Sequence, residues 1–175
     1  HGEKALPIAR QLEHPQLLAR CLNSLSYIHS YLRQWDKAEL YANEARQLYA
    51  ASGNQVLAAD SQRIVGWAQM YTGWPQTSLA TLEETFAFSQ QIENLWGEAE
   101  CGWRLAHTML ELGRYGQAIR HAREAIKQAR LVGIPIMILL AQTTWGVIQR
   151  TVMALDHAED TLLESLAHST DHNLT

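Results

Sequence analysis

The stretch Gly102–Arg130, GWRLAHTMLELGRYGQAIRHAREAIKQAR, decides the fold, because its apolar residues recur at helical spacing on both sides of a short turn. Before the turn, Leu105, Met109 and Leu112 follow one another at the spacing of an amphipathic helix. After it, small residues form a stripe that lets another helix approach closely: Ala118, Ala122, Ala125 and Ala129. Gly113 is typical of a helix end. The stretch predicts a helical hairpin.

The features of this hairpin recur with a period of forty residues. Three positions of the hairpin, followed through four copies, are Gly, Ala or Ser in eleven of twelve cases: Ser26, Gly66, Ala106, Gly146; Ala38, Ser78, Ala118, Ala158; Ala45, Thr85, Ala125, Ser165. Chance would give about three. Turns recur as Arg33–Asp36, Gly73–Pro75, Gly113–Tyr115 and Met153–Asp156, and unit ends as Gly53, Asn94, Gly133 and Asn173. The pattern predicts a helical repeat array.

The expected array has about nine helices, no strands and loops of a few residues. The array is expected to begin with a partial unit, residues 3–12, of which only the second helix is present, at Lys4–Leu12. Four full units are expected to follow at about 15–53, 54–93, 94–133 and 134–173. Their helix pairs are expected at 15–33 with 36–52, 55–72 with 75–91, 95–112 with 115–131, and 135–153 with 156–169. Asp36 and Asp156 are predicted N-caps, and Pro75 a first-turn residue.

Such hairpins stack because none can bury its apolar stripe alone, so the predicted fold is all-α, a right-handed α-solenoid of antiparallel helix hairpins with a concave inner face. We expect residues 1–175 to form a single array, cut from a longer protein because the chain starts at His1 within a helical pattern. Apolar surface is then exposed at both ends. The helix at 135–153 is apolar almost all round, and the helix at 156–169, a further unit or another copy must cover it.

The repeat resembles the tetratricopeptide repeat family, which has a small residue midway along the first helix, alanines in the second, and a turn with glycine and an aromatic residue. LAHTMLELGRYGQAIRHAREAI (Leu105–Ile126) is the closest match, and SLSYIHSYLRQWDKAELYANEA (Ser24–Ala45) is nearly as good. The common repeat has thirty-four residues rather than forty. The longer variety is similar to arrays in large bacterial regulators and signalling ATPases.

The resemblance implies that the face of each first helix opposite the packing stripe lines a groove for an extended peptide or a partner helix. Aromatic residues and arginine are the usual anchors of such interfaces, and arginine can bind a carboxylate through two hydrogen bonds. The candidate contacts are Asn23, Tyr27, Tyr31, Arg63, Trp67, Tyr71, Trp103, His107 and Arg150. Alternatively, several of these aromatic residues pack between adjacent first helices.

Composition excludes several other classes of function. The net charge is −4 without a basic stripe, so direct binding of nucleic acid is not expected. The longest apolar run, Ile134–Ala141, falls short of the roughly 20 residues that span a membrane. Cys21 and Cys101 lie two units apart, which predicts two reduced thiols and a cytoplasmic protein.

Motifs for catalysis or metal binding are absent from the sequence. It has no GxxxxGK loop, no HExxH and no CxxC pair. His168 and His172 have the spacing of a helix-borne metal pair but lie in a polar tail near only Asp171, so no metal is expected. We therefore predict neither enzymatic activity nor a cofactor.

Together these features predict a protein–protein interaction scaffold that binds a peptide or partner protein in its concave groove. By resemblance, it would be part of a bacterial protein of signalling or transcription regulation. The alternative is an intramolecular sensor segment that binds a small effector or a neighbouring ATPase or DNA-binding domain. Self-association through the exposed array ends is left open.

Overall fold

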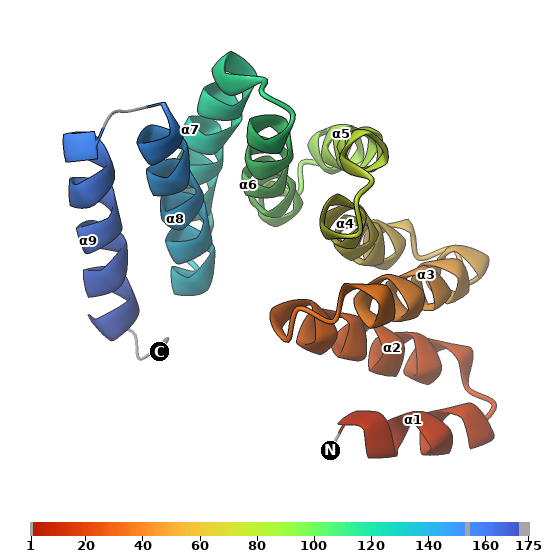
Figure 1. Cartoon of the computed structure of the whole chain (residues 1–175). Coiled ribbons are helices and arrows are strands. Elements are labelled where there is room, and N and C mark those ends of the chain that lie inside the picture. Colours follow the sequence, from red (N-terminus) through yellow and green to blue (C-terminus); the bar gives the residue numbers. More distant parts are fainter. Residues whose placement is uncertain (1, 153–154, 172–175) are drawn as a thin grey trace. The chain divides into compact units, whose positions relative to one another are not determined.

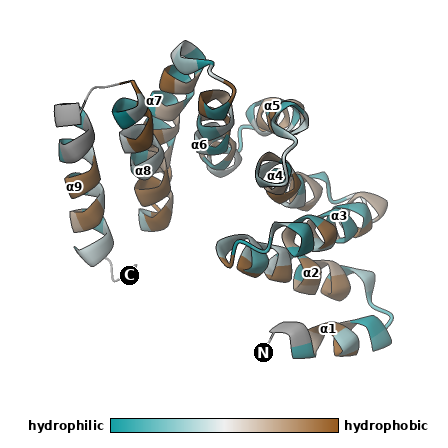
Figure 2. Ribbon diagram, in the orientation of Figure 1, coloured by the Kyte–Doolittle hydropathy of each residue, from teal (hydrophilic) through white to brown (hydrophobic). Residues whose placement is uncertain are grey.

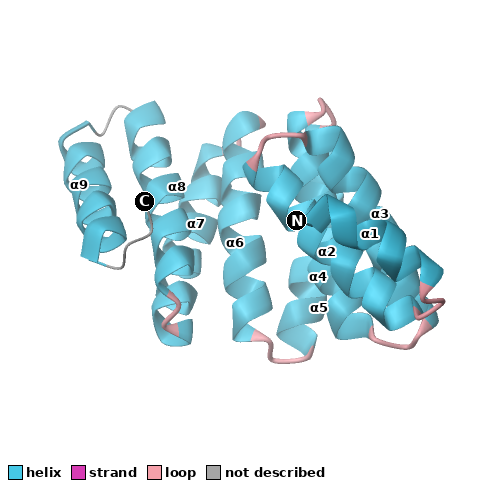
Figure 3. Cartoon of the chain, turned by 90° about the horizontal axis from the view of Figure 1, so that it is seen from below, coloured by secondary structure: helices cyan, strands magenta, loops and turns pink. Residues whose placement is uncertain are grey.

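The computed structural model describes residues 2–152 and 155–171, and all regular elements in these ranges are helices (Figure 1). Nine helices lie in the described part of the chain: α1 (Gly2–Gln11), α2 (Pro15–Tyr31), α3 (Trp35–Ala51), α4 (Gln55–Tyr71), α5 (Pro75–Gln91), α6 (Leu95–Glu111), α7 (Tyr115–Val132), α8 (Pro135–Thr151) and α9 (Leu155–Asp171). Short loops join the helices from α1 to α8, as Figure 3 shows. The all-α fold of antiparallel hairpins predicted from the sequence is confirmed.

The period of forty residues holds to the residue in the first helices. The helices α2, α4, α6 and α8 begin at residues 15, 55, 95 and 135, and each contains 17 residues. The observed helix ends lie within two residues of those predicted. The sequence repeat is therefore a repeat of structure.

The predicted N-caps Asp36 and Asp156 are wrong. The helix α3 begins at Trp35 after Gln34, so Asp36 lies in its first turn, and Asp156 is the second residue of α9. In the first turn an aspartate can still interact favourably with the helix dipole. Side-chain caps are instead supplied by Asn54 and Asn94, forty residues apart, which accept hydrogen bonds from the backbone N–H groups three residues later at 3.1 Å, and by His14, which accepts from Leu17 N–H at 3.3 Å.

The connections between helices explain why the caps lie elsewhere. A residue in the left-handed conformation recurs every twenty residues: Glu13, Arg33, Gly53, Gly73, Glu93, Gly113 and Gly133. After Arg33, Gly53, Gly73, Glu93 and Gly113, the next backbone N–H donates back to the carbonyl five residues earlier, as from Gln34 to His29 at 2.9 Å and from Arg114 to Met109 at 2.8 Å. The following helix begins two residues after the left-handed residue, whether or not a capping side chain is present there.

The chain divides into two compact units, residues 1–85 and 86–175, with the division inside α5. In the first unit α3 packs against α2 and α4, and α1 packs against α2. Two apolar clusters hold these helices together, one around Ala19, Leu22 and Tyr49, the other around Ile64 and Val65. The prediction of a single array through residues 1–175 concerns how the two units join, and it stays a prediction.

In the second unit α7 packs against α6 and α8, and α8 also contacts α6 and α9. The strongly apolar helix α8, visible in Figure 2, is covered by these three neighbours. Met137 and Ile148 are buried, and Arg123 lies over the ring of Trp145, 5.1 Å from its centroid. The helix predicted at 156–169 is thus part of the cover of α8.

The small residues of the repeat lie where helices approach most closely. Of the twelve predicted positions, the eleven whose side chains are described are all buried, while the Ala158 side chain lies outside the described residues. A Cβ atom on Gly66 would lie 2.8 Å from Cγ of Leu82, and one on Gly146 would lie 2.7 Å from Cγ of Leu162. These two glycines, eighty residues apart, make the same close contact in their own hairpins.

Candidate partner-binding face on the first helices

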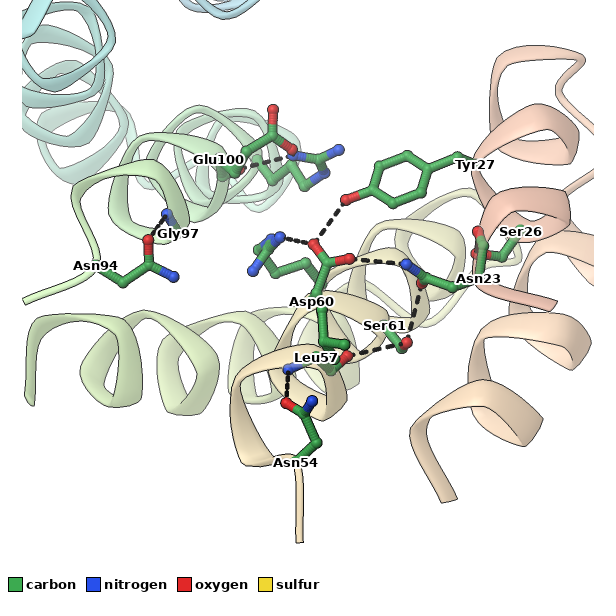
Figure 4. A network of polar contacts seen from close by, with 12 residues as sticks. Asn23, Ser26, Tyr27, Asn54, Leu57, Asp60, Ser61, Asn94, Gly97 and Glu100 are labelled. Carbon is green, nitrogen blue, oxygen red and sulfur yellow. Dashed lines mark hydrogen bonds and ion pairs between the residues drawn. The ribbon is translucent and has the colours of Figure 1, made fainter. Parts of the chain in front are cut away.

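Asp60 of α4 is the centre of a hydrogen-bond network that joins two neighbouring first helices in unit 1 (Figure 4). Its Oδ2 accepts from Asn23 Nδ2 at 2.8 Å, and its Oδ1 accepts from the Tyr27 hydroxyl at 2.9 Å. The guanidinium of Arg63, one helical turn further along α4, donates to the same Oδ1. The Ser61 hydroxyl donates to Asn23 Oδ1 at 2.9 Å. Three of the predicted contact residues are therefore brought together by one carboxylate.

Helical spacing places these groups on one face. Asn23 and Tyr27 are four residues apart on α2, while Asp60 and Arg63 are three apart on α4, so each pair lies on one side of its helix. Asp60 is 8% exposed and Arg63 only 1%. A buried carboxylate needs compensating partners, and the donors around Asp60 supply them. The network fixes how α2 and α4 meet along this face.

Next to the network lies a group of three aromatic residues. The ring of Trp35, at the start of α3, stacks on Tyr71, at the end of α4, with centroids 4.1 Å apart and planes 6° apart. Trp67 meets Tyr71 edge to face at 5.0 Å. A depression of about 470 Å³ borders the stack and is also lined by Arg33 of the preceding loop and by Lys37 in the first turn of α3. Trp67 and Tyr71 thus pack with an aromatic residue from a second helix.

In unit 2 the corresponding face carries a different cluster. Glu100, forty residues after Asp60, accepts a hydrogen bond from the guanidinium of Arg104, one turn later on α6. The same guanidinium lies over the ring of Trp103, 4.1 Å from its centroid. All three side chains are buried. A carboxylate–arginine pair therefore recurs on the first helix, with the arginine one residue further along.

His107 lies one turn after Trp103 on α6 and is partly buried. Burial lowers the pKa of His107 to about 4, because the protonated ring would lose its hydration. Between pH 6.5 and 4 the unfolded chain therefore binds a proton that the native state refuses. We expect the free energy of unfolding to fall as the pH falls through this window, with about 2 kcal/mol lost at pH 5 from this residue alone.

Urea unfolding of the protein and of His107→Gln at pH 7.5 and pH 5 measures this loss. The variant should lose about 2 kcal/mol less stability on acidification than the parent. His157→Gln, which alters an exposed histidine of α9, is the matched control and should keep the parental pH dependence. Equal acid sensitivity of the parent and His107→Gln would show that His107 does not titrate in this way.

The two remaining predicted contacts lie at the ends of first helices. Tyr31 ends the face of α2 and is 64% exposed, and Arg150 is exposed near the end of α8. Sequence reasoning missed Trp35, because this residue belongs to a second helix, and Arg104, because it falls outside the predicted face. It also missed Asp60, which is not among the predicted contacts and which joins two first helices. The sequence feature that could have revealed both carboxylate–arginine pairs is an acidic residue three or four positions before an arginine on the same helix.

Other classes of site find no support in the described residues. Among them, His, Cys, Asp and Glu side chains form no group of three or more that could hold a metal ion. His172 of the pair considered above lies outside the described residues. The helices within residues 2–152 and 155–171 include none long and apolar enough to cross a membrane.

Repeated antiparallel hairpins with small residues at their crossings define the class of tetratricopeptide-like helical repeat proteins. Solved structures with this fold include the apo form of RapI, with 15% identity, a TM-score of 0.75, and coverage of 98% of this chain and 63% of RapI. A Rap protein complexed with Competence and Sporulation Factor matches with 16% identity and a TM-score of 0.81, over 91% of this chain and 46% of that protein.

A third similar structure is a signal transduction ATPase with numerous domains and a tetratricopeptide repeat sensor, from Pyrococcus horikoshii. It is 14% identical, with a TM-score of 0.71, and the match covers 97% of this chain and 27% of the ATPase. The chain thus spans less than two-thirds of the length of these proteins. No protein-family model and no curated protein sequence matches the chain.

Proposed function

We propose that the protein is a non-enzymatic interaction scaffold that binds a peptide or a partner protein on the face of its first helices, the concave side in this class of fold. We further propose that it is a cytoplasmic segment of a bacterial regulatory or signalling protein, built from the long, forty-residue variety of tetratricopeptide repeat. Two similar structures support a regulatory or signalling role: a Rap protein is complexed with Competence and Sporulation Factor, and a signalling ATPase carries a repeat sensor.

The observation that carries the proposal is the Asp60 network. Burying a carboxylate and a guanidinium is costly in free energy, and a hydrophobic pair of similar volume would serve packing at least as well. Here the pair holds Asn23 and Tyr27 of α2 in fixed positions beside the aromatic group on α4. Side chains held in advance lose less entropy when a ligand binds. The side chains of this face are thus held in fixed positions before any ligand binds, as the side chains of a preorganised binding surface are.

The predicted contacts divide into two roles under this proposal. Arg63 and Trp67 are buried and set the shape of the face. Tyr31 is exposed, and Tyr27 and Tyr71 are partly so, which leaves them accessible to a partner. In unit 2, Trp103 and His107 would have the first role, and exposed Arg150 could bind a carboxylate. A tyrosine at the open end of the face is a suitable anchor.

Selection of peptides from a display library against the full chain, followed by titration, tests the proposal. We expect Tyr31→Ala to weaken the selected peptides by about tenfold or more, as loss of an interface anchor does. Tyr115→Ala is the matched control, because it removes an exposed tyrosine from the start of a second helix, and binding should not change. Peptides that bind both variants equally well would place the binding surface elsewhere.

The second candidate, an intramolecular sensor segment for a small effector or a neighbouring ATPase or DNA-binding domain, is favoured by the depression beside the Trp35–Tyr71 stack. Flat rings beside exposed polar side chains suit a small aromatic or heterocyclic effector. A panel of such compounds measured by thermal shift separates the candidates. Stabilisation that Trp35→Leu removes, together with a failed peptide selection, would favour the sensor.

A further inference from the structure

The exposed side of α7 carries a row of cations, which we call the basic stripe. Its members are exposed and three or four residues apart: Arg120, Arg123, Lys127 and Arg130. Residues at this spacing lie on one side of a helix. The one acidic residue of α7 is Glu124, although the chain as a whole has a net charge of −4. The expectation, drawn from composition, that the chain has no basic stripe is therefore wrong for this helix.

The other repeats show that the fold does not require these cations. The equivalent positions are Leu40, Asn43, Gln47 and Ala50 on α3, Ala80, Glu83, Ala87 and Gln90 on α5, and Asp160, Leu163, Ala167 and Thr170 on α9. None of them is a cation, and all but Asn43 are exposed. A cation in the last turn can stabilise a helix through its dipole, but Arg120 and Arg123 lie in the middle of α7. Neither packing nor helix stability explains the stripe.

Two cations of the stripe take part in weak ion pairs. Lys127 Nζ lies 3.6 Å from Glu124 Oε1, and Arg130 Nη2 lies 3.4 Å from Oε1 of Glu164 on α9. All four side chains of these pairs are more than half exposed, and ion pairs in such positions contribute little to stability. Both cations can therefore exchange these acids for the carboxylates of a partner at small cost.

The other two cations have no acidic partner in residues 2–152 and 155–171. Arg120 is exposed, and Arg123 lies over the ring of Trp145 on α8. This ring is half-buried, whereas Leu105, forty residues earlier, is fully buried. The stripe thus combines positive charge with an accessible tryptophan edge, and arginine and tryptophan are the usual anchors of interfaces.

We propose that the basic stripe binds an acidic α-helix of another protein, at a surface separate from the first-helix face. Successive cations of the stripe are about 4.5, 6 and 4.5 Å apart along the axis of α7. Carboxylates at positions i, i+3, i+7 and i+10 of a second helix have the same spacing. Side chains on one face of an extended strand are about 6.8 Å apart and fall out of register. Each arginine can bind a carboxylate through two hydrogen bonds.

Nucleic acid is the other kind of polyanion that a basic stripe could attract. The stripe covers only about 15 Å of α7, whereas DNA carries one negative charge per about 1.7 Å of its axis. A duplex would extend beyond the stripe over a chain with a net charge of −4. Glu124 and Glu164, next to the cations, would also repel it. A short acidic helix matches the stripe in length and spacing.

The probe is a fluorescently labelled, alanine-rich peptide of about 18 residues, long enough to form a helix, with glutamate at positions i, i+3, i+7 and i+10. Its matched control carries glutamine at these four positions, which keeps the size and the helix propensity. In titrations with the full chain at about 50 mM salt, the glutamate peptide should bind about tenfold or more tightly than the glutamine peptide. Most of this difference should disappear at about 500 mM salt, because salt screens exposed charges.

Two double variants of the protein locate the binding. Arg120→Glu with Arg123→Glu should weaken the glutamate peptide by about tenfold or more. Arg33→Glu with Lys37→Glu is the matched control, because it changes the net charge equally at two exposed cations outside the stripe, and binding should not change. Glutamate is tolerated at residue 33, since Glu93 has the same left-handed conformation. Circular dichroism checks that both variants keep their helices.

A peptide with lysine in place of the four glutamates separates recognition from a structural effect of the substitutions. It should bind the Arg120→Glu, Arg123→Glu variant more tightly than the parent protein, because the charges on both sides are reversed. Equal binding of the glutamate and glutamine peptides, equal weakening by the two double variants, or no reversal with the lysine peptide would overturn the proposal.

Two further outcomes would replace the proposed partner by another. Undiminished binding of a glutamate peptide in which two prolines prevent a helix would make the partner an extended chain. A DNA duplex of about 20 base pairs that binds more tightly than the glutamate peptide, and that Arg120→Glu with Arg123→Glu releases, would make nucleic acid the ligand. Because Tyr31→Ala leaves α7 unchanged, failure here and failure of the first-helix face can be told apart.

Discussion

Asp60→Ala should destabilise the protein by about 3–5 kcal/mol, because it leaves the guanidinium of Arg63 buried without its carboxylate. The same change removes the acceptor for Asn23 and for the Tyr27 hydroxyl, which join α2 to α4. Most of the cost comes from the buried charge that remains, since a single lost hydrogen bond contributes only about 1 kcal/mol.

Urea unfolding at pH 7.5 measures this effect, and Asp36→Ala, which removes an exposed acid from the first turn of α3, is the control. The control should lose less than about 1 kcal/mol. The double variant Asp60→Leu with Arg63→Met removes both charges and should recover most of the lost stability. If Asp60→Ala is no less stable than the control, the network does not hold α2 to α4.

The second large effect concerns the contact of Gly66 with Leu82, where the backbone of α4 approaches α5. A Cβ atom at residue 66 would lie 2.8 Å from Leu82 Cγ, closer than carbon atoms pack. Gly66→Ala should therefore cost about 1–3 kcal/mol through overpacking, despite the better helix propensity of alanine. Leu82→Ala should cost about 2–5 kcal/mol, because Leu82 is fully buried.

The repeat predicts that the two changes compensate each other. Positions sixteen residues apart pair Gly66 with Leu82 and Gly146 with Leu162 in two of the four repeats, whereas the other two repeats have the pairs Ser26–Ala42 and Ala106–Ala122. Where the first residue of the pair is glycine, the second is leucine. Where the first residue is the larger serine or alanine, the second is alanine. In Gly66→Ala with Leu82→Ala the methyl group fills space that the leucine vacates.

A double-mutant cycle by urea unfolding tests this compensation. The double variant should be more stable than the sum of the single changes predicts, by about 1 kcal/mol or more. Gly116→Ala is the control, because nothing lies within 4 Å of a Cβ atom at this helical glycine, and it should not destabilise the protein. Strict additivity of the two changes would contradict the direct contact.

Much of the fold could be predicted from the sequence because small residues mark the crossings of helices and recur at a fixed distance. Ser26, Ala106 and their equivalents gave the register, and the helix ends followed to within two residues. The caps at Asp36 and Asp156 were predicted wrongly because capping preference is a local tendency. The length of each connection is set instead by its left-handed residue, which at Arg33 and Glu93 is not glycine and leaves no clear mark in the sequence.

The candidate site was predictable as a face but not as a set of contacts. Helical spacing alone places Asn23 and Tyr27 on one side of α2. That both meet Asp60 depends on how far α2 and α4 are shifted along each other, which packing decides. The stack of Trp35 on Tyr71 joins the start of a second helix to the end of a first helix, a relation that spacing within one helix does not show.

The central claim is that partners bind on the face of the first helices, and hydrogen exchange of the full chain with and without a selected peptide tests it most directly. We expect slower exchange in α2 and α4 on binding, while α3, whose stripe of Ala38, Ala42 and Ala45 is already buried, changes little. Protection confined to α3, or no protection in α2 and α4 when the peptide is bound, would show that partners bind elsewhere.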